Sequence, residues 1–256
     1  MSASDVQETR DKSLAPKGDI YHGSIAERYH QSRSKSPKWE QERQSLLSLL
    51  DECLDIHRVL DVPFGTGRFV PDYRTRGLEV VGLDSSLDMF NASRVYLQEH
   101  SIAQAETTFV VGDAFALPFA DEQFDAVVCV RFLASVVALK DVPMVLAEIA
   151  RVSARFALIQ FRVPAASVEL PATRRPEERM EHQCGVDDQN LLLDRAGFRI
   201  LSETFDGDPE RGGLRLVRCQ RPPDAHPEGE RFGFSSLMTL PETWISDTFD
   251  PTAVGE

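Results

Sequence analysis

From residue 57 onward, short runs of apolar and β-branched residues alternate with stretches that have apolar residues at helical spacing. The runs predict strands at residues 58–64, 79–84, 107–113, 124–130 and 155–163. The stretches between them predict helices near residues 67–76, 86–100 and 140–152. Alternation of this kind is typical of βα units on a parallel sheet. The third helix has one apolar stripe, as expected of a helix that covers a sheet face, formed by Val142, Val145, Leu146, Ile149 and Val152.

The chain after these units follows a different pattern. A linker rich in Pro, Arg and Glu at residues 164–186 leads to a predicted helix that stops at Gly197 and is followed by a sixth strand. The turn at residues 207–213 leads to a seventh strand at residues 214–220, which we expect to run antiparallel to its neighbour. The predicted fold class is therefore α/β, with a seven-stranded, mostly parallel sheet and helices on both faces.

The segments outside this sheet differ from it in composition. Residues 1–20 are polar and are predicted to be a disordered N-terminus, whereas residues 21–56 predict an N-terminal helical cap. Residues 57–221 make up the main domain. Residues 222–256 form an irregular C-terminal tail that is too apolar for a plain solvated tail, so we expect it to be partly packed and partly disordered. The helical spacing of the cap is that of Leu46, Leu47, Leu50 and Leu54.

Composition and charge narrow the class of partner. The chain has 256 residues, of which 42% are hydrophobic, enough for one main domain. With 28 basic and 41 acidic residues its formal net charge is −13, which repels the phosphate backbone of a nucleic acid. Its 4 cysteines form no CxxC pair, which argues against a zinc ribbon or a disulfide framework. No apolar run approaches the ~20 residues of a membrane span, and the polar N-terminus lacks a signal-peptide core. We therefore expect a cytoplasmic protein that does not bind nucleic acid.

The sequence VLDVPFGTGRF at residues 59–69 is a strand that runs into a glycine-rich turn. Glycine lets the backbone approach a ligand closely, so a nucleotide-like cofactor is expected here. A P-loop would have a Lys-Ser or Lys-Thr pair after the second glycine, but an Arg-Phe pair follows Gly67. A dinucleotide fold would have a third glycine where this chain has Val70. Asp61, just before the turn, suits the sulfonium and ammonium groups of S-adenosylmethionine better than a phosphate.

Two further carboxylates end the next two predicted strands. Asp84 follows Gly67 at nearly the offset of about 20 residues at which an acidic side chain reaches the ribose hydroxyls. Alternatively, it only caps the helix that starts near Ser86. Asp113 is placed to accept from the adenine amino group, with a role as a turn residue as the alternative. Asp125, before the fourth strand, is interpreted as structural.

Four segments occur in the order "LDVPFGTG", "GLDSSLDM", "GDAFALPFADEQFD" and "LAEIARV". They resemble the segments of class I S-adenosylmethionine-dependent methyltransferases, which have a Rossmann-like sheet, over about residues 57–220. Within this group the chain is most similar to bacterial methyltransferases of unassigned substrate associated with lipopolysaccharide-kinase-like proteins. The resemblance implies that the methionine end is lined by Asp61, Gly65 and Gly67, the ribose is held by Asp84, the adenine is flanked by Ser85 and Met89 with Asp113 and Ala114 at its edge, and the floor is closed by Val130 and Arg131.

Pro63 and Phe64 stand at the methionine end where the family has a glycine and another small residue. One amide donor is lost and the pocket wall is expected to be bulkier. Proline has a fixed φ that the end of an extended strand tolerates. Because Gly65 and Gly67 are retained, we interpret the loop as a variant that still binds the cofactor.

The sequence is less informative about catalysis. Methyl transfer to a good nucleophile needs mainly positioning, and a base only where the acceptor must lose a proton. Many relatives have a histidine pair after the fourth strand, where this chain has Ala134 and Ser135. Each remaining histidine is as well explained as a surface residue, and Arg131 as a partner of a neighbouring carboxylate. "HQC" at residues 182–184 offers no partner pair for a metal, so none is expected. The candidates for catalysis are Arg131, His22, His30 and Tyr21, with His182, Tyr29 and Arg33 as further possibilities.

Two functions are compatible with these features. The first is an S-adenosylmethionine-dependent methyltransferase that acts on a small-molecule, sugar or lipid-linked acceptor and releases S-adenosylhomocysteine. The second is a catalytically silent methyltransferase-like subunit that binds a protein partner, or a second copy of itself, through the N-terminal cap or the C-terminal tail. The identity of the acceptor and of any general base is left open.

Overall fold

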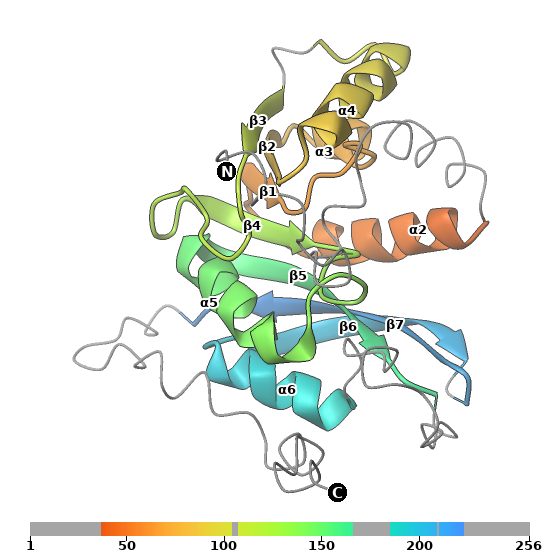
Figure 1. The fold of residues 1–256 in the computed structure, drawn as a ribbon, viewed down its shortest axis with the longest axis vertical. Coiled ribbons are helices and arrows are strands. Elements are labelled where there is room, and N and C mark those ends of the chain that lie inside the picture. Colours follow the sequence, from red (N-terminus) through yellow and green to blue (C-terminus); the bar gives the residue numbers. More distant parts are fainter. Residues whose placement is uncertain (1–36, 104–106, 166–184, 209, 223–256) are drawn as a thin grey trace, which may run out of the picture.

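The structure is a computed structural model that describes residues 37–103, 107–165, 185–208 and 210–222. These residues form a seven-stranded sheet in the order β3-β2-β1-β4-β5-β7-β6 (Figure 1). Strands β1 to β5 pair in parallel, and β7 runs antiparallel between β5 and β6. The predicted α/β class and the antiparallel seventh strand are confirmed. The strands are β1 (Arg58–Asp61), β2 (Glu79–Asp84), β3 (Thr107–Val111), β4 (Phe124–Cys129), β5 (Ser153–Val163), β6 (Arg199–Asp208) and β7 (Gly212–Gln220).

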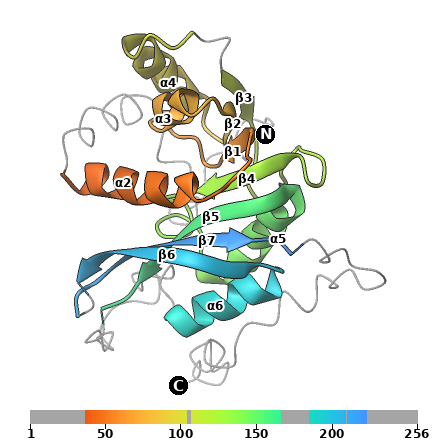
Figure 2. The same ribbon diagram turned by 180° about the vertical axis from the view of Figure 1, so that it is seen from behind.

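Helices cover both faces of this sheet (Figures 1 and 2). The helices of one face are α2 (Pro37–Asp51), α3 (Val70–Thr75) and α4 (Leu87–Glu99), and those of the other are α5 (Val142–Val152) and α6 (Val186–Arg195). Strand side chains alternate between two buried clusters, because successive residues of a strand point to opposite faces. In β1, Val59 belongs to the cluster with α2 and α3, and Leu60 to the cluster with α5 and α6. The predicted apolar stripe of α5 is buried throughout.

Helix α2, the helical part of the predicted cap within the described residues, packs directly on the sheet. Its buried leucines share a cluster with Phe156 and Leu158 of β5 and with Leu216 of β7. The helix contacts β5, β6 and β7, so it is one of the helices that cover the sheet. Residues 21–36 of the predicted cap lie outside the described residues, as do the predicted disordered N-terminus and the tail beyond residue 222.

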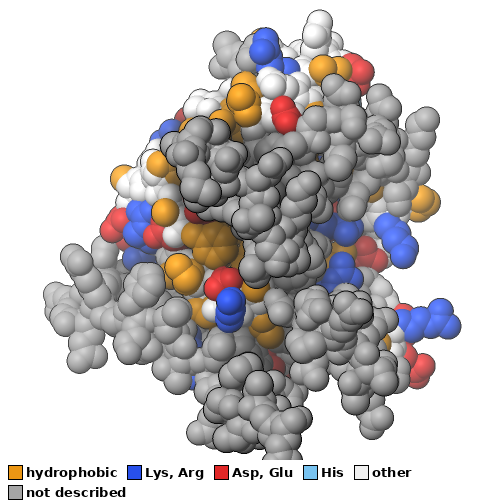
Figure 3. Space-filling model, viewed as in Figure 1, with side chains coloured by type: hydrophobic (Ala, Val, Ile, Leu, Met, Phe, Trp, Pro, Cys, Tyr) orange, Lys and Arg blue, Asp and Glu red, His pale blue; other side chains and the backbone are white. Residues whose placement is uncertain are grey.

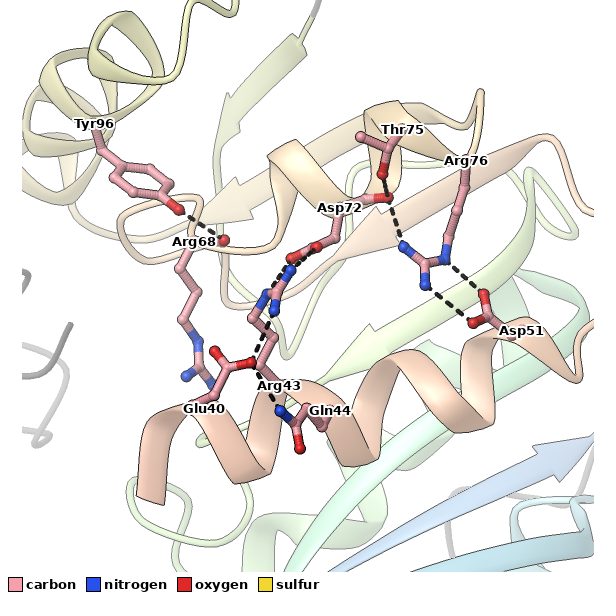
Figure 4. A network of polar contacts seen from close by, with 9 residues as sticks. All are labelled: Glu40, Arg43, Gln44, Asp51, Arg68, Asp72, Thr75, Arg76 and Tyr96. Atoms are coloured by element: carbon pink, nitrogen blue, oxygen red, sulfur yellow. Dashed lines mark hydrogen bonds and ion pairs between the residues drawn. The ribbon is translucent and has the colours of Figure 1, made fainter. Parts of the chain in front are cut away.

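Two bidentate ion pairs join α2 to α3 and to Arg76, the residue that follows α3 (Figure 4). Arg43 of α2 pairs with Asp72 of α3, donating from Nε to Oδ2 at 2.8 Å and from a second guanidinium nitrogen to Oδ1. At the other end of α2, Asp51 accepts from Nε and Nη2 of Arg76 at 2.6 and 3.0 Å. Paired hydrogen bonds between a guanidinium and a carboxylate fix orientation as well as distance. They hold α2 in place beside the loop that precedes α3.

Some predicted elements have different ends in the structure. The first strand was expected to reach residue 64, but β1 ends at Asp61. The Val62–Pro63 peptide bond is cis, and Pro63 has no N–H to pair with a neighbouring strand. The helix predicted from residue 67 begins at Val70, with a proline in its first turn, where a missing N–H costs nothing.

Charged side chains of both signs are mixed over the described part of the face drawn in Figure 3. The cysteines at positions 53, 129 and 219 are free thiols in the core. Within the described ranges, no helix combines the length and the apolar character needed to cross a membrane.

Candidate cofactor site

A pocket opens at the carboxyl edge of the sheet between β1 and β4. The strand order reverses here, since β2 and β3 lie beside β1 and β5 lies beside β4. Parallel α/β sheets bind ligands at such switch points. We call it the cofactor pocket. It is lined by Asp61 and residues 63–66, 68 and 69 from the β1 end, by Asp84, Ser85 and Met89 from the β2 end, and by Val130, Arg131 and Val136 from the β4 end.

The loop after β1 turns at two glycines in the left-handed region. Gly65 has a φ of 57° and Gly67 a φ of 69°, which side chains rarely adopt. A Cβ at Gly67 would also lie 2.7 Å from Cζ of Phe64. The Phe64 N–H donates to the Leu83 carbonyl at 2.8 Å, which ties the loop to β2. The loop is thereby held in one shape at the pocket wall.

Phe64 takes up less of the pocket than its size suggests. Its ring lies against Gly82 of β2, where a Cβ would come within 2.2 Å of the ring atom Cδ2. The ring also meets Phe109 edge-on, with 5.5 Å between centroids, and only 4% of the residue is exposed. Phe64 therefore makes the pocket wall less bulky than the sequence led us to expect. Most of the ring fills the space left by the missing side chain at Gly82, and only part of it lines the pocket.

Asp84 links the two loops at the pocket. Its Oδ2 accepts from the Gly65 N–H at 2.8 Å, and its Oδ1 from the Ser86 N–H at 2.9 Å. Ser86 is the N-cap of α4, and its hydroxyl accepts from the Met89 N–H at 3.3 Å. The alternative of a role at the helix start is therefore present in the structure. It does not exclude ligand binding, because a carboxylate accepts at about four positions.

Asp61 is a buried carboxyl group with 3% of its surface exposed. Burial raises its pKa well above the usual value for an aspartate; the Arg68 guanidinium opposes this rise, and the Asp84 carboxylate adds to it. A cation that enters the pocket favours the ionised form of such a group. The site is suited to an ammonium group.

Glu42 of α2 connects the helix to the cofactor pocket. It is 2% exposed, and its Oε1 accepts from Nε of Arg131 at 2.6 Å and from Nε2 of Gln160 at 2.7 Å, while Oε2 pairs with Arg68. Burial alone would raise its pKa, but the two guanidinium groups and the amide hold the pKa below its ordinary value. None of the motifs includes Glu42. The sequence could have identified it, because Glu42 lies on the same helix face as the apolar Leu46. A carboxylate on such a face indicates a buried ion pair.

Arg131 forms the ion pair that was the alternative to a catalytic role. It follows β4 with a φ of 63°, and its N–H donates to Oε1 of Gln160 at 3.1 Å. Its guanidinium is partly exposed and lines the cofactor pocket as well as pairing with Glu42. Further lining residues, to which the motifs assign no role, are Thr66, Arg68, Phe69 and Val136.

The pocket brings together most of the predicted cofactor residues. Gly67 shapes the loop without lining the pocket, and Asp113 and Ala114 also lie outside the lining. Oδ1 of Asp113 accepts from the Phe115 N–H at 2.9 Å, as a turn residue would. Their adenine contacts stay predictions. The remaining catalytic candidates lie outside the described residues: His22, His30, Tyr21, His182, Tyr29 and Arg33.

The chemistry of the lining fits S-adenosylmethionine. Asp61 and Asp84 provide carboxylate acceptors for an ammonium group and for hydroxyl groups. Met89 and Val130 provide buried apolar surface for a flat ring. At Gly65 the absence of a side chain leaves the backbone open to the ligand, since a Cβ there would meet only Met89 Cε, at 3.8 Å. Among the described residues, no three His, Cys, Asp or Glu side chains come together as metal ligands would.

Residues 59–155, which contain the cofactor pocket from Asp61 to Val136, match the family model described as "Methyltransferase domain". This segment, which is less than half of the chain, is similar to methyltransferase domains, and the sheet around it has the Rossmann-like fold of class I methyltransferases. A solved relative supports the same fold for the methyltransferase domain and its surroundings. Magnesium protoporphyrin IX methyltransferase from Synechocystis PCC 6803, solved with bound SAH, has a TM-score of 0.64 and 17% sequence identity over 80% of this chain and 97% of that chain.

Curated relatives are similar to parts of the chain. A demethylmenaquinone methyltransferase of Renibacterium salmoninarum is 46% identical over 70 residues, which are 27% of each chain. An uncharacterized methyltransferase of Bacillus subtilis, YcgJ, is 31% identical over 128 residues, which are 49% of each chain. The chain thus spans about half or less of the length of these relatives.

Proposed function

We propose that the chain is an S-adenosylmethionine-dependent methyltransferase that modifies a small-molecule, sugar or lipid-linked acceptor and releases S-adenosylhomocysteine. The observation that carries the proposal is the cofactor pocket at the strand switch point, with Asp61 and Asp84 at adjacent strand ends inside the matched segment. Carboxylates at these two places attract a cation and accept from hydroxyl groups.

The predicted cofactor residues have proposed roles. Asp61 and the Gly65 backbone hold the methionine end, and Asp84 accepts from the ribose hydroxyls. Ser85 and Met89 flank the adenine ring, with Val130 at the floor. Asp113 and Ala114 reach the ring edge only if it extends past Ser85 toward β3. These assignments predict that the acceptor approaches from the open side near Arg131.

The residues of the pocket act by positioning. When bound, S-adenosylmethionine would supply an electrophilic methyl group on its sulfonium sulfur, with S-adenosylhomocysteine as the leaving group, and Asp61 and the Gly65 backbone would hold its methionine end. Phe64, Phe69 and Val130 are buried apolar residues that exclude water from the lining. Holding two reactants in line in a dry site contributes much of the rate.

Three observations bear on the class of the acceptor. The resemblance to bacterial methyltransferases of unassigned substrate favours a sugar or lipid-linked acceptor, and the curated relatives add demethylmenaquinone as a lipid acceptor to assay. The acidic net charge argues against nucleic acid.

The experiment is an assay of the full chain with methyl-labelled S-adenosylmethionine and a panel of acceptors that includes demethylmenaquinone. We expect label in at least one acceptor, together with one S-adenosylhomocysteine for each methyl transferred. Binding of the cofactor without transfer to any acceptor would favour the silent subunit instead. Absence of cofactor binding would contradict both.

A further inference from the structure

A second pocket lies at the same carboxyl edge, over the ends of β5 and β6 and the start of β7. Its charged lining residues are Lys38, Arg131, Arg162, Asp206 and Arg211, and we call it the basic pocket. Gly212 and Gly213 contribute backbone to it, so its wall at β7 carries no side chain there. Four cations and one carboxylate line the pocket in a chain whose net charge is −13, and two of these cations also pair outside the lining, Arg211 with Asp208 and Arg131 with Glu42.

The arginines of the basic pocket are held in place without full neutralisation by the described residues. Nε of Arg162 donates to the Ala134 carbonyl at 3.1 Å, which positions the guanidinium without adding a negative charge. Burial, together with the charge of Arg131, lowers the pKa of Arg162 below its ordinary value. Glu42 offsets part of the Arg131 charge but is shared with Arg68. Two partly buried guanidinium groups that repel each other are stabilised when an anion comes between them.

Arg131 lines both pockets, so they adjoin at this residue. A molecule that reaches from the basic pocket past Arg131 therefore enters the cofactor pocket. Ligands of α/β sheets bind at the carboxyl ends of the strands, and both pockets lie there. Two ligands bound in the two pockets would therefore come close to each other at Arg131.

We propose that the basic pocket binds an oxyanion group, a phosphate or a carboxylate, of the methyl acceptor, with Arg162 as its main contact and Lys38 and Arg131 as further contacts. The proposal rests on the proposed function, because it names the acceptor class of that reaction. The oxyanion anchors the acceptor and does not itself receive the methyl group, since pairing with several cations reduces its nucleophilicity. The methyl group goes to another atom of the acceptor, on the side of Arg131 that faces the cofactor pocket.

The basic pocket also sets specificity. An uncharged acceptor of the same shape would desolvate the Arg162 guanidinium, whose hydrogen bond to the Ala134 carbonyl brings no negative charge, without pairing its charge. Leaving buried polar groups unpaired is how a site rejects an analogue that lacks the matching group. Arg162 is therefore a specificity-determining residue.

The test measures anion binding to the full chain by ligand-observed NMR, with inorganic phosphate and with acetate as separate probes. Each titration is run with and without saturating S-adenosylhomocysteine. The variants are Arg162→Gln and a matched control, Arg155→Gln. Arg155 lies at the other end of β5, and its guanidinium donates to the Asp55 carbonyl at 2.8 Å, so the two arginines have similar contacts and the same charge.

We expect at least one probe to bind about tenfold more weakly to Arg162→Gln, because a charge-assisted hydrogen bond is lost, and unchanged binding to Arg155→Gln. The probe that binds tells a phosphate from a carboxylate group. Lys38→Gln, at an exposed position of α2, gives a smaller loss and decides the question if Arg162→Gln fails to fold. Equal binding to all variants, equal loss in both arginine variants, or no binding to the wild type would overturn the proposal. Failure of S-adenosylhomocysteine binding alone would contradict the proposed function and leave the anion comparison readable.

Discussion

The two ends of the carboxyl edge of the sheet differ in their balance of charges. At the β1 and β2 end, which we call the acidic end, Asp61 and Asp84 line the cofactor pocket together with Arg68, whereas the basic pocket at β5, β6 and β7 has four cations and one carboxylate. Glu42 lies where the two meet and pairs with Arg131, the residue that lines both. A cationic cofactor and an anionic acceptor are drawn to different ends of the edge. The difference in charge therefore directs the two ligands to separate places, so both can be bound at the same time.

The largest expected effect comes from removing the ion pairs of Glu42, which lies where the two ends meet. Glu42→Gln removes the carboxylate between Arg68 and Arg131 and leaves the two guanidinium groups facing each other. We expect it to lower the free energy of unfolding by about 3–5 kcal/mol, since removing one partner of a buried ion pair leaves an uncompensated charge. The control is Glu40→Gln on the same helix, where an exposed pair with Arg43 is lost and about 0.2–1 kcal/mol is expected. Urea unfolding measures both, and equal losses would contradict the role of Glu42.

The wild-type contribution of Glu42 also depends on pH. Because the pKa of Glu42 is lowered in the folded state, its contribution to stability is present above the pKa of an unfolded glutamate and is lost as the pH falls through the lowered value. Glu42→Gln removes this part of the acid dependence. Urea unfolding at several pH values should therefore show the free energies of unfolding of the wild type and of Glu42→Gln converging as the pH falls.

A smaller effect is expected at the wall of the cofactor pocket. Gly82→Ala places a Cβ against the Phe64 ring, where the distance to Cδ2 would be 2.2 Å. Overpacking of this kind costs about 1–3 kcal/mol. The loss should be smaller when Phe64→Ala is made at the same time, since the clash is then absent. Strict additivity in this double-mutant cycle, measured by thermal unfolding, would show that the ring does not depend on Gly82.

The third prediction concerns the acidic end alone. The pKa of Asp61 is raised in the free protein, and a cationic ligand binds the ionised form, so affinity for S-adenosylmethionine should increase as the pH rises toward and through that pKa. Below it, each unit of pH costs up to about tenfold. Asp61→Asn should bind weakly with a flat profile, while Asp121→Asn, at a remote exposed ion pair, should keep the wild-type slope. A sloped profile in Asp61→Asn would assign the pH dependence to another group.

The smallest effect is expected at the rim of the basic pocket. The Arg211 side chain is 87% exposed, so solvent screens its charge. Arg211→Gln should weaken phosphate or acetate binding by less than about twofold. Ligand-observed NMR makes the comparison with Arg162→Gln. A larger loss of binding in Arg211→Gln than in Arg162→Gln would place the anion at the exposed rim, near Arg211. It would contradict the role of Arg162 as the main contact.

The two ends also differ in how far the sequence predicts them. The motifs include Asp61, Gly65 and Asp84. Each motif is a short continuous stretch of sequence, because it consists of one strand end and the loop that follows it. The Phe64 ring is compensated by Gly82 on the next strand, which no local pattern shows. The basic pocket collects Lys38 from α2, Arg131 from the loop after β4 and Arg162 from β5, and only the sheet order brings these distant parts of the chain together.

The central claim is that the acidic end holds the cofactor, and calorimetric titration of the full chain with S-adenosylhomocysteine tests it most directly. The variants are Asp84→Ala and Asp125→Ala. Asp125 also accepts from two backbone N–H groups, those of His57 and Arg58 at 2.8 and 2.9 Å, but at the amino edge of the sheet. We predict micromolar-range binding to the wild type, binding of similar strength to Asp125→Ala, and a loss of about a hundredfold or more in Asp84→Ala. Unchanged binding to Asp84→Ala would contradict the account.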